Sequence, residues 1–286
     1  MTAPAALGED RGICFRPEPG KTVSKWRLQD AARRLLPKHK GLQRCHCSQA
    51  WGNSVQLWRG KHGAFFTGLQ QCGSIWVCPV CAGKVAEGRA EELQRGIDYA
   101  LEVGHGCMMV TLTFSHGRGD ILADTLTGFS KALRRLKSGR AYQALMRRYG
   151  ILGEVRALEV THGQANGWHP HTHAVTFSHR KLSALDLVWF KRDLWVLWRA
   201  ACKKAGLGLP SLAHGLHVRS AKDAAGYVAK WGFATEVTRS HLKSAKVGGR
   251  TPWQLLADAD AGDQRAAWLF REFAQCFKGK RQLYYS

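Results

Sequence analysis

The spacing of apolar and polar residues predicts alternating strands and helices through the middle of the chain. Residues 107–114 form a nearly continuous apolar run, which is typical of a strand buried in a sheet. Residues 154–161 alternate as a second strand, and a turn at 162–167 leads into a third strand at 169–177. Helical spacing, a capping box at Ser183 and short apolar runs predict the remaining elements of this region, namely helices at 122–136, 183–205 and 223–231 and a strand at 214–219.

The order of these elements predicts the fold class. From residue 107 to residue 231 it is β-α-β-β-α-β followed by a helix, which is the ferredoxin-like split arrangement. We therefore expect an α+β fold with an antiparallel sheet and helices on one face. The other face is then free to build a site.

The flanking regions differ in composition and predict a three-part chain. A basic helix around residues 26–36, two short strands at 55–58 and 64–66, and a helix at 83–103 come before the core. After it, two helices begin near Thr251-Pro252 and Gly262-Asp263, and the last residues read as the middle of a strand. We expect an N-terminal segment with a cysteine-rich module, a central domain and a C-terminal helical extension, over residues 1–82, 83–234 and 235–286.

Charge narrows the class of partner. The 286 residues carry 43 Lys and Arg against 21 Asp and Glu, a net charge of +22, and the isoelectric point is about 10.0. Such a field attracts polyanions, of which nucleic acid is the commonest. No segment approaches the roughly 20 apolar residues of a membrane span, and residues 1–11 lack an apolar signal core. We expect a cytoplasmic protein with a nucleic-acid partner and no membrane partner; the sequence does not predict its oligomeric state.

Five of the nine cysteines lie within 37 residues and predict a structural zinc site. Cys78-Pro79-Val80-Cys81 forms a CxxC turn that aims two thiolates at one ion, and Cys72 comes just before it. Either Cys45 or Cys47 completes a tetrahedral set, and the spacing does not choose between them. The alternatives are a redox-active pair or a group of buried thiols.

Three histidines at alternating positions predict a second metal site. His169, His171 and His173 share one face of the third strand, where rigid imidazoles suit a divalent ion. Pro170 is expected to turn the chain and take His169 out of this row. Glu159 on the preceding strand should lie near His173; a carboxylate and two imidazoles leave metal positions open for substrate oxygens. The alternative is a His-rich turn that leads into an ordinary core strand.

The last predicted helix carries three reactive side chains at i−4, i and i+3, so that Asp223, Tyr227 and Lys230 project from one side. A tyrosine that faces a metal-bound phosphate can attack it and form a covalent phosphotyrosine. Lys230 could stabilise the transition state or hold a DNA phosphate, and Asp223 could activate a second attacking hydroxyl. The alternatives are a core aromatic for Tyr227 and a helix-terminal carboxylate for Asp223.

Four motifs together resemble a known family over roughly residues 40–286. His169-Pro170-His171-Thr172-His173 looks like the paired-histidine motif of HUH endonucleases. The segments 110–114, 227–230 and 72–81 resemble their first motif, their tyrosine motif and the cysteine-rich part of plasmid rolling-circle replication initiator (Rep) proteins of the single-tyrosine class.

The resemblance implies a metal-dependent enzyme that nicks and rejoins single-stranded origin DNA. His171 and His173 would be metal ligands for Mg²⁺ or Mn²⁺, and Tyr227 would be the nucleophile. Cleavage would leave a 5′-phosphotyrosine link and a free 3′-hydroxyl, with host polymerase and helicase as partners. Two positions depart from the family pattern: Asp223 stands where Glu is usual, and Thr172 stands where a bulky hydrophobe is usual.

Two rival functions remain open at this point. A conjugative relaxase or a single-strand transposase would share the histidine and tyrosine chemistry, although such enzymes usually lack the cysteine-rich front module. A non-catalytic, zinc-containing DNA-binding regulator would account for the charge and the cysteines. It would leave the histidine row and the Asp223, Tyr227 and Lys230 set unexplained.

Overall fold

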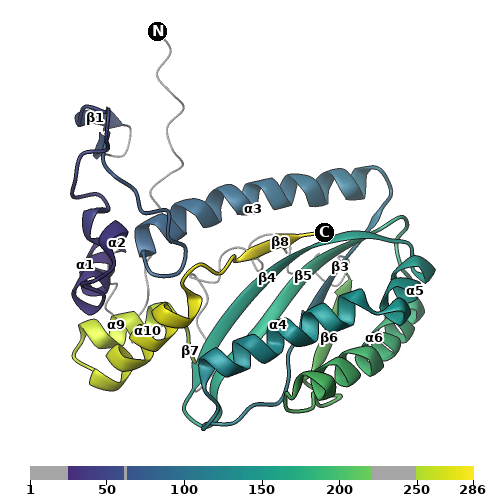
Figure 1. The fold of residues 1–286 in the computed structure, drawn as a ribbon. Coiled ribbons are helices and arrows are strands. Elements are labelled where there is room, and N and C mark those ends of the chain that lie inside the picture. The colour runs from purple at the N-terminus through teal and green to yellow at the C-terminus, as the bar shows by residue number, and fades with distance from the viewer. Residues whose placement is uncertain (1–24, 61–62, 221–248) are drawn as a thin grey trace. The chain divides into compact units, whose positions relative to one another are not determined.

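The computed structural model describes residues 25–60, 63–220 and 249–286 (Figure 1). The chain forms two compact units. One takes its described residues from Met1–Val85 and Trp253–Gln275, and the other from Ala86–Pro252 and Cys276–Ser286. In the described part of the chain, no helix has the length and apolar character that crossing a membrane requires.

An antiparallel sheet organises the larger unit, which confirms the expected α+β class. The strand order is β6-β3-β5-β4-β7, and β8 also pairs with β4. The strands are β3 (Gly106–Leu112), β4 (Ile151–Gly163), β5 (Gly167–Ser178), β6 (Leu216–Ser220), β7 (Gly249–Arg250) and β8 (Leu283–Tyr285). The strands around the predicted turn extend further than expected, because β4 and β5 pair all the way to Gly163 and Gly167.

Three helices cover one face of this sheet: α4 (Leu122–Ser138), α5 (Arg140–Arg148) and α6 (Ala184–Ala205). The rings of Phe129 in α4 and Trp198 in α6 meet edge to face at 5.8 Å, and the Trp198 indole donates to the carbonyl of Thr113 at 2.7 Å. The capping box forms as predicted, with Ser183 and Asp186 bonding reciprocally. The short helix α5 has no counterpart in the sequence prediction.

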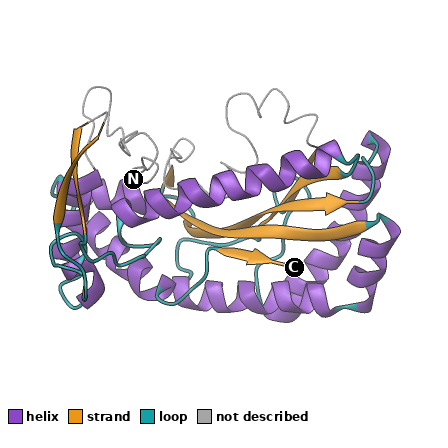
Figure 2. Cartoon of the chain, turned by 90° about the horizontal axis from the view of Figure 1, so that it is seen from above, coloured by secondary structure: helices purple, strands orange, loops and turns teal. Residues whose placement is uncertain are grey.

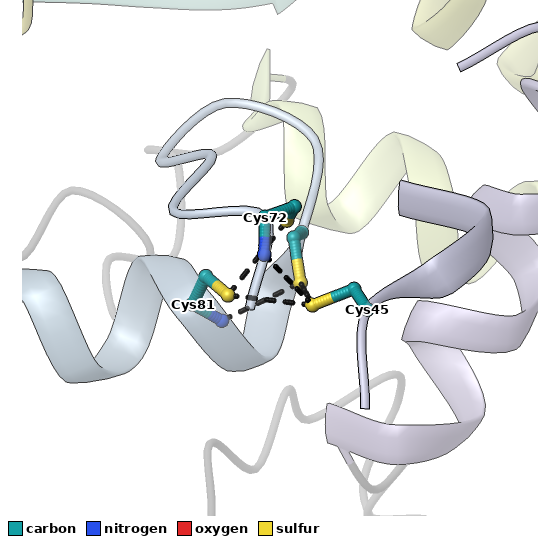
Figure 3. A group of neighbouring side chains, drawn as sticks. Cys45, Cys72 and Cys81 are labelled. Carbon is teal, nitrogen blue, oxygen red and sulfur yellow. Dashed lines mark hydrogen bonds between the residues drawn. The ribbon is translucent and has the colours of Figure 1, made fainter. Parts of the chain in front are cut away.

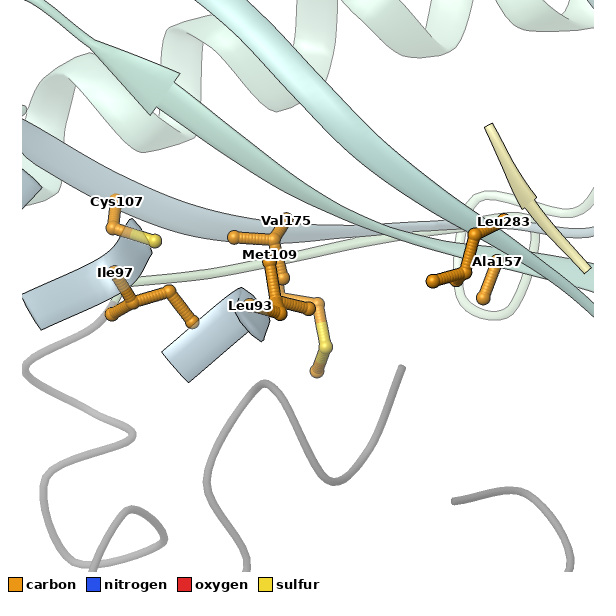
Figure 4. Close-up of a cluster of buried hydrophobic side chains, with 7 residues drawn as sticks. All are labelled: Leu93, Ile97, Cys107, Met109, Ala157, Val175 and Leu283. Carbon is orange, nitrogen blue, oxygen red and sulfur yellow. The ribbon is translucent and has the colours of Figure 1, made fainter. Parts of the chain in front are cut away.

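The expectation that the opposite face is free is wrong. Helix α3 (Pro79–Glu102) places Leu93 and Ile97 against Met109 and Val175 on that face, in a buried cluster that also contains Cys107, Ala157 and Leu283 (Figure 4). Helices therefore flank the strands on both sides (Figure 2). The physical reason is that β3 carries apolar side chains on both of its faces, with Thr111 as its one polar residue, so both faces require cover.

The smaller unit combines the N-terminal part of the described chain with residues 253–275, whereas residues 276–286 belong to the larger unit. It contains α1 (Lys25–Leu35), α2 (Lys40–Arg44), β1 (Gln56–Gly60), β2 (Gly63–Thr67), the start of α3, α9 (Pro252–Asp260) and most of α10 (Gln264–Phe277). The expected helices after residues 251 and 262 are thus present. Arg27 and Arg34 of α1 each bond the buried carboxylate of Asp260 at 2.6 Å, and Trp76 meets Phe273 edge to face. The charged contacts join α1 to α9, and the aromatic contact joins Trp76 to α10. The smaller unit is therefore built from two separate stretches of the sequence.

Candidate metal centre and active site

The histidine row lies on the sheet face that α3 covers in part. Val175 belongs to the apolar cluster under α3, and His173 and His171 continue the same face along β5 because strand residues two apart share a face. The strand runs unbroken through Pro170, so the expected turn there is not observed. Pro170 is tolerated because β3 pairs with β5 only as far as Thr172, which leaves that edge of β5 unpaired at the proline.

Glu159 completes a group of three ligand-type side chains. On β4 it pairs with His171 rather than His173, and its carboxylate reaches both rings, at 3.5 Å from His171 Nε2 and 3.7 Å from His173 Nε2. All three ligand atoms lie within 4.8 Å of one another, and the Glu159 side chain is almost fully buried. A buried carboxylate held by two imidazoles is costly unless a cation or protons balance its charge.

Hydrogen bonds to the other ring nitrogens orient both imidazoles. His171 Nδ1 donates to the carbonyl of His169 at 3.1 Å, and His173 Nδ1 meets the Thr111 hydroxyl at 2.8 Å. The carbonyl of His169 requires a proton on His171 Nδ1, and the Thr111 hydroxyl can accept one from His173 Nδ1, so both Nε2 atoms can direct a lone pair toward a metal, as is usual for metal-bound histidine. The donor set, its separations and its outer hydrogen bonds therefore fit a divalent cation.

His169 stays in the row but is engaged elsewhere. Its Nε2 lies 3.3 Å from the Thr113 hydroxyl, its Nδ1 meets His116 Nε2, and its ring stacks on that of His171 with centroids 5.0 Å apart. Burial, with His171 and His116 nearby, lowers the pKa of His169 to about 3, so the ring is neutral. Both nitrogens are occupied by hydrogen bonds, which makes His169 a support for His171 rather than a ligand in this conformation.

The predicted catalytic side chains Asp223, Tyr227 and Lys230, and the helix predicted for 223–231, lie outside the described residues. Strand β6 is described up to Ser220, just before them. It pairs with β3 so that His217 is opposite Thr111, which places His217 on the sheet face of the histidine row. The chain therefore enters the predicted tyrosine segment from the strand next to β3.

Four cysteines of the smaller unit converge on one point, and Figure 3 labels three of them, Cys45, Cys72 and Cys81. Cys45, Cys72, Cys78 and Cys81 form the second ligand group, and Cys47 is exposed and outside it. The Sγ atoms are 3.6 Å apart for Cys45 and Cys81, 3.7 Å for Cys72 and Cys81, and 3.9 Å for Cys45 and Cys78. A tetrahedron with Zn–S bonds of about 2.3 Å has edges of about 3.8 Å, so the sulfur positions fit a zinc ion.

Donors around the sulfurs favour thiolates at this site. The backbone N–H of Cys72 donates to Cys45 Sγ, that of Cys81 donates to Cys78 Sγ, and the buried amide of Gln29 donates to Cys78 Sγ at 3.1 Å. Hydrogen bonds from the Cys72, Cys78 and Cys81 thiols lower the pKa of Cys45, and the same bonds to Cys45 raise the pKa values of Cys72 and Cys78, so the thiolate is favoured first at Cys45. In contrast, burial alone raises the pKa of the Cys107 thiol to about 12, as expected for a cysteine that only packs.

We predict that Cys78→Ser or Cys81→Ser destabilises the smaller unit, whereas Cys47→Ser does not. Removing one of four thiolates should cost roughly 3–4 kcal/mol, a quarter of the ~10–16 kcal/mol that structural zinc supplies in small modules. Thermal unfolding together with elemental analysis of the purified proteins measures this. Protein purified without chelator that contains no zinc would contradict the site, as would equal losses in all three variants.

Sequence reasoning missed three side chains of the histidine site. Thr111 orients His173, His116 orients His169, and His217 shares their sheet face. Thr111 and His217 could have been found from the strand register, since both align with His173 across the sheet. His116 lies in a loop after β3, and its sequence position carries no such signal.

Comparisons with known proteins agree with the resemblance. The profile of a family described as Replication protein matches residues 67–286. "Protein rep" of Streptomyces lividans is 30% identical over 282 residues, which cover 76% of this chain and 62% of that protein. "Neomycin resistance protein" of Streptomyces cyanogenus is 34% identical over 132 residues, covering 38% of this chain and 30% of that protein.

The chain spans less than two thirds of the length of either curated relative. The family match nevertheless begins at the last residue of β2 and includes the histidine site and three of the four grouped cysteines, with Cys45 lying before it. Since this match covers well over half of the residues, the chain belongs to the replication protein family.

Proposed function

We propose that the chain is a replication initiator that nicks single-stranded origin DNA by an HUH endonuclease mechanism. The observation that carries this proposal is the convergence of Glu159, His171 and His173 on the central strands of the sheet, in a member of the replication protein family. Family membership supports a role in replication, and the group of three ligand-type side chains supports a metal-dependent reaction at this position of the sheet.

The strand connections support an HUH core of the split β-α-β type. β3 and β4 run parallel with β5 between them, since each is antiparallel to β5. β5 and β6 likewise run parallel with β3 between them. In each β-α-β unit, the two parallel strands are thus separated by one strand of the other unit. His171 and His173 lie on β5, which with β3 forms the inner pair of these four strands.

Glu159, His171 and His173 would hold the catalytic ion, for which we propose Mg²⁺ or Mn²⁺. Such an ion, when bound, withdraws charge from a phosphate and stabilises the charge that develops during substitution. Thr111 and the carbonyl of His169 would keep the two imidazoles in the ligating tautomer. The carboxylate oxygen in the set favours hard cations of this kind.

The proposed reaction is a transesterification at one DNA phosphate. The phenolic oxygen of Tyr227 attacks phosphorus and loses its proton to solvent or a nearby base, while the bond from phosphorus to the 3′-oxygen breaks. The 5′ end stays on Tyr227, and the released 3′-hydroxyl can be extended by a host polymerase, with a host helicase opening the duplex. We assign Lys230 to the charge of the attacked phosphate.

We predict that Asp223→Ala forms the first covalent adduct and then accumulates it. Termination needs a second attacking hydroxyl, and Asp223 is the sole carboxylate in the sequence between Asp193 and Glu236 that could activate it. Asp223→Glu should keep release. If Asp223 only caps a helix, Asp223→Asn is silent in both steps and Asp223→Ala costs about 0.5–2 kcal/mol of stability. A time course of adduct formation and release decides, and normal release from Asp223→Ala would exclude the general-base role.

One assay separates the proposed enzyme from a DNA-binding regulator. The chain is incubated with Mn²⁺ and single-stranded oligonucleotides that tile the replicon encoding it, and denaturing gels are read for a covalent complex. A nicking enzyme gives a complex that chelator prevents; a regulator gives none. A conjugative relaxase or single-strand transposase would also give a complex. A second assay uses supercoiled plasmid that carries the cleaved origin: a replication initiator starts rolling-circle synthesis from the nick, and these two enzymes do not.

A further inference from the structure

The β1–β2 ribbon exposes large apolar side chains on both of its faces. Trp58 pairs with Phe65 on one face, and Leu57 pairs with Phe66 on the other. The exposed fractions are 44% and 45% for the first pair and 64% and 62% for the second. An isolated two-stranded ribbon is only marginally stable in water, and these side chains contribute little to a core. Their exposure therefore indicates a surface that contacts another molecule.

The aromatic pair on the first face is held in place before any partner binds. The indole Nε1 of Trp58 donates to the hydroxyl of Thr67 at 3.0 Å, across to the neighbouring strand. Phe65 stands directly opposite Trp58, so two rings lie side by side on one face. A fixed pair of rings loses little conformational entropy on contact with a flat ligand.

The cysteine group anchors the base of the ribbon. Gln49 and Leu69 form an isolated bridge below it, and the N–H of His46 donates to the carbonyl of Gln70 at 2.7 Å. Cys45 and Cys72, which converge with Cys78 and Cys81, stand at the two ends of this segment. The ribbon is thus presented on a closed, anchored loop.

Charge identifies the kind of partner. No acidic residue occurs between Asp30 and Glu87, while this stretch contains eight Lys and Arg, one of which is the exposed Arg59 on the ribbon itself. Flat aromatic rings among cations suit unpaired bases and phosphates, which combine stacking with charge. A protein partner could bury the apolar side chains, but its binding would not require a stretch of chain in which every charged residue is positive.

We propose that the β1–β2 ribbon is a binding surface for single-stranded DNA, with bases stacked on Trp58 and Phe65 and phosphates near Arg59, the next residue along β1. It is a second contact, separate in sequence and in chemistry from the Glu159, His171 and His173 group. The inference rests on the nucleic-acid partner of the proposed function but not on the nicking reaction.

The test measures affinity for a labelled oligo-dT single strand by fluorescence anisotropy in the Tyr227→Phe background, where no cleavage is expected. Trp58→Ala and Phe65→Ala should each weaken binding by about 5- to 150-fold, the effect of losing one stacked base. Trp58→Phe should retain most of the affinity because the ring is kept, which guards against loss of the ribbon fold. Arg59→Gln should reduce the salt slope by about 0.7.

Trp268→Ala is the matched control. Trp268 is exposed to a similar degree, 49% against 44% for Trp58, and it also stands beside an arginine, Arg265, but it lies on α10. The inference is overturned if Trp268→Ala weakens binding as much as Trp58→Ala. It is also overturned if the ribbon variants bind oligo-dT normally, or if their affinity for duplex DNA falls as much as their affinity for oligo-dT. A third contrary result is a change in self-association, measured by sedimentation, with no change in DNA affinity.

Cleavage by the ribbon variants keeps this inference distinct from the proposed function. With Tyr227 intact, Trp58→Ala should raise the oligonucleotide concentration that half-saturates formation of the covalent complex. A chain that never forms the complex yet binds oligo-dT through Trp58 refutes nicking and leaves the ribbon surface standing. A chain that nicks but binds oligo-dT independently of Trp58 and Phe65 refutes the ribbon surface alone.

Discussion

Tyr227→Phe is expected to abolish strand cleavage and leave DNA affinity nearly unchanged. The substitution removes the one oxygen that attacks phosphorus and keeps the ring, so chemistry is lost without a large change in packing or charge. Covalent complex on a denaturing gel measures the first effect, and anisotropy with the same oligonucleotide measures the second. A Phe variant that still forms the complex would show that another residue is the nucleophile.

Other tyrosines provide the controls for this result. Tyr99 on α3 is 66% exposed, so Tyr99→Phe should cleave normally. Tyr149 is buried against Phe190, and burial together with Glu154 raises the pKa of Tyr142, which disfavours the attacking phenolate. If Tyr227→Phe retains activity, these three are the next to replace, beginning with the exposed Tyr99.

The second large effect is expected at the metal ligands. His171→Ala or His173→Ala should remove cleavage and its dependence on divalent ions together, with a fall in Mn²⁺ affinity of about 100-fold or more, since even outer-shell losses cost 10–100-fold. His169→Ala should cost less, because both of its nitrogens are bonded to Thr113 and His116. Titration calorimetry with Mn²⁺ ranks the three variants.

His179→Ala is the control for these substitutions. His179 follows the end of β5, is exposed and lies outside the ligand group, so its loss should leave Mn²⁺ binding unchanged. Equal and complete losses of metal binding in the His169, His171 and His173 variants would contradict the supporting role given to His169. Unchanged binding in the His171 variant would remove the proposed catalytic metal site.

Periodicity was sufficient to predict the sheet that carries the site. A period of two places His169, His171 and His173 on one face whatever the register, and the strand hairpin brings Glu159 alongside. The period does not say what covers that face. Helix α3 packs on that face through its own apolar stripe. Which face of the sheet a helix covers depends on contacts between distant parts of the chain, so a local sequence pattern does not predict it.

Local backbone geometry decided what the cysteine spacing left open. Cys45 and Cys47 are two residues apart, so counting residues favours neither. In the structure His46 has a positive φ of 57°, a conformation that interrupts the extended chain between them. Cys45 then faces Cys78 and Cys81, and Cys47 is left exposed. A histidine in this conformation could not be anticipated from its type alone.

Thr172 lies between His171 and His173, the two proposed metal ligands, where the resembled family usually has a bulky hydrophobe. Thr172 faces the side of the sheet opposite to His171 and His173 and is buried there. Its hydroxyl has no hydrogen-bond partner among the described residues. A bulky hydrophobe would suit this environment better, so Thr172 affects packing beneath the site and leaves the ligand positions alone.

Peptide mapping of the covalent complex tests most directly whether this chain is a tyrosine nicking enzyme. The complex formed with Mn²⁺ and single-stranded origin oligonucleotide is digested with nuclease and protease, and the peptides are sequenced by mass spectrometry. We predict a nucleotide linked through its 5′-phosphate to Tyr227, absent when chelator is present. A phosphate on any other residue, or no covalent complex with any strand of the replicon, would contradict the proposed mechanism.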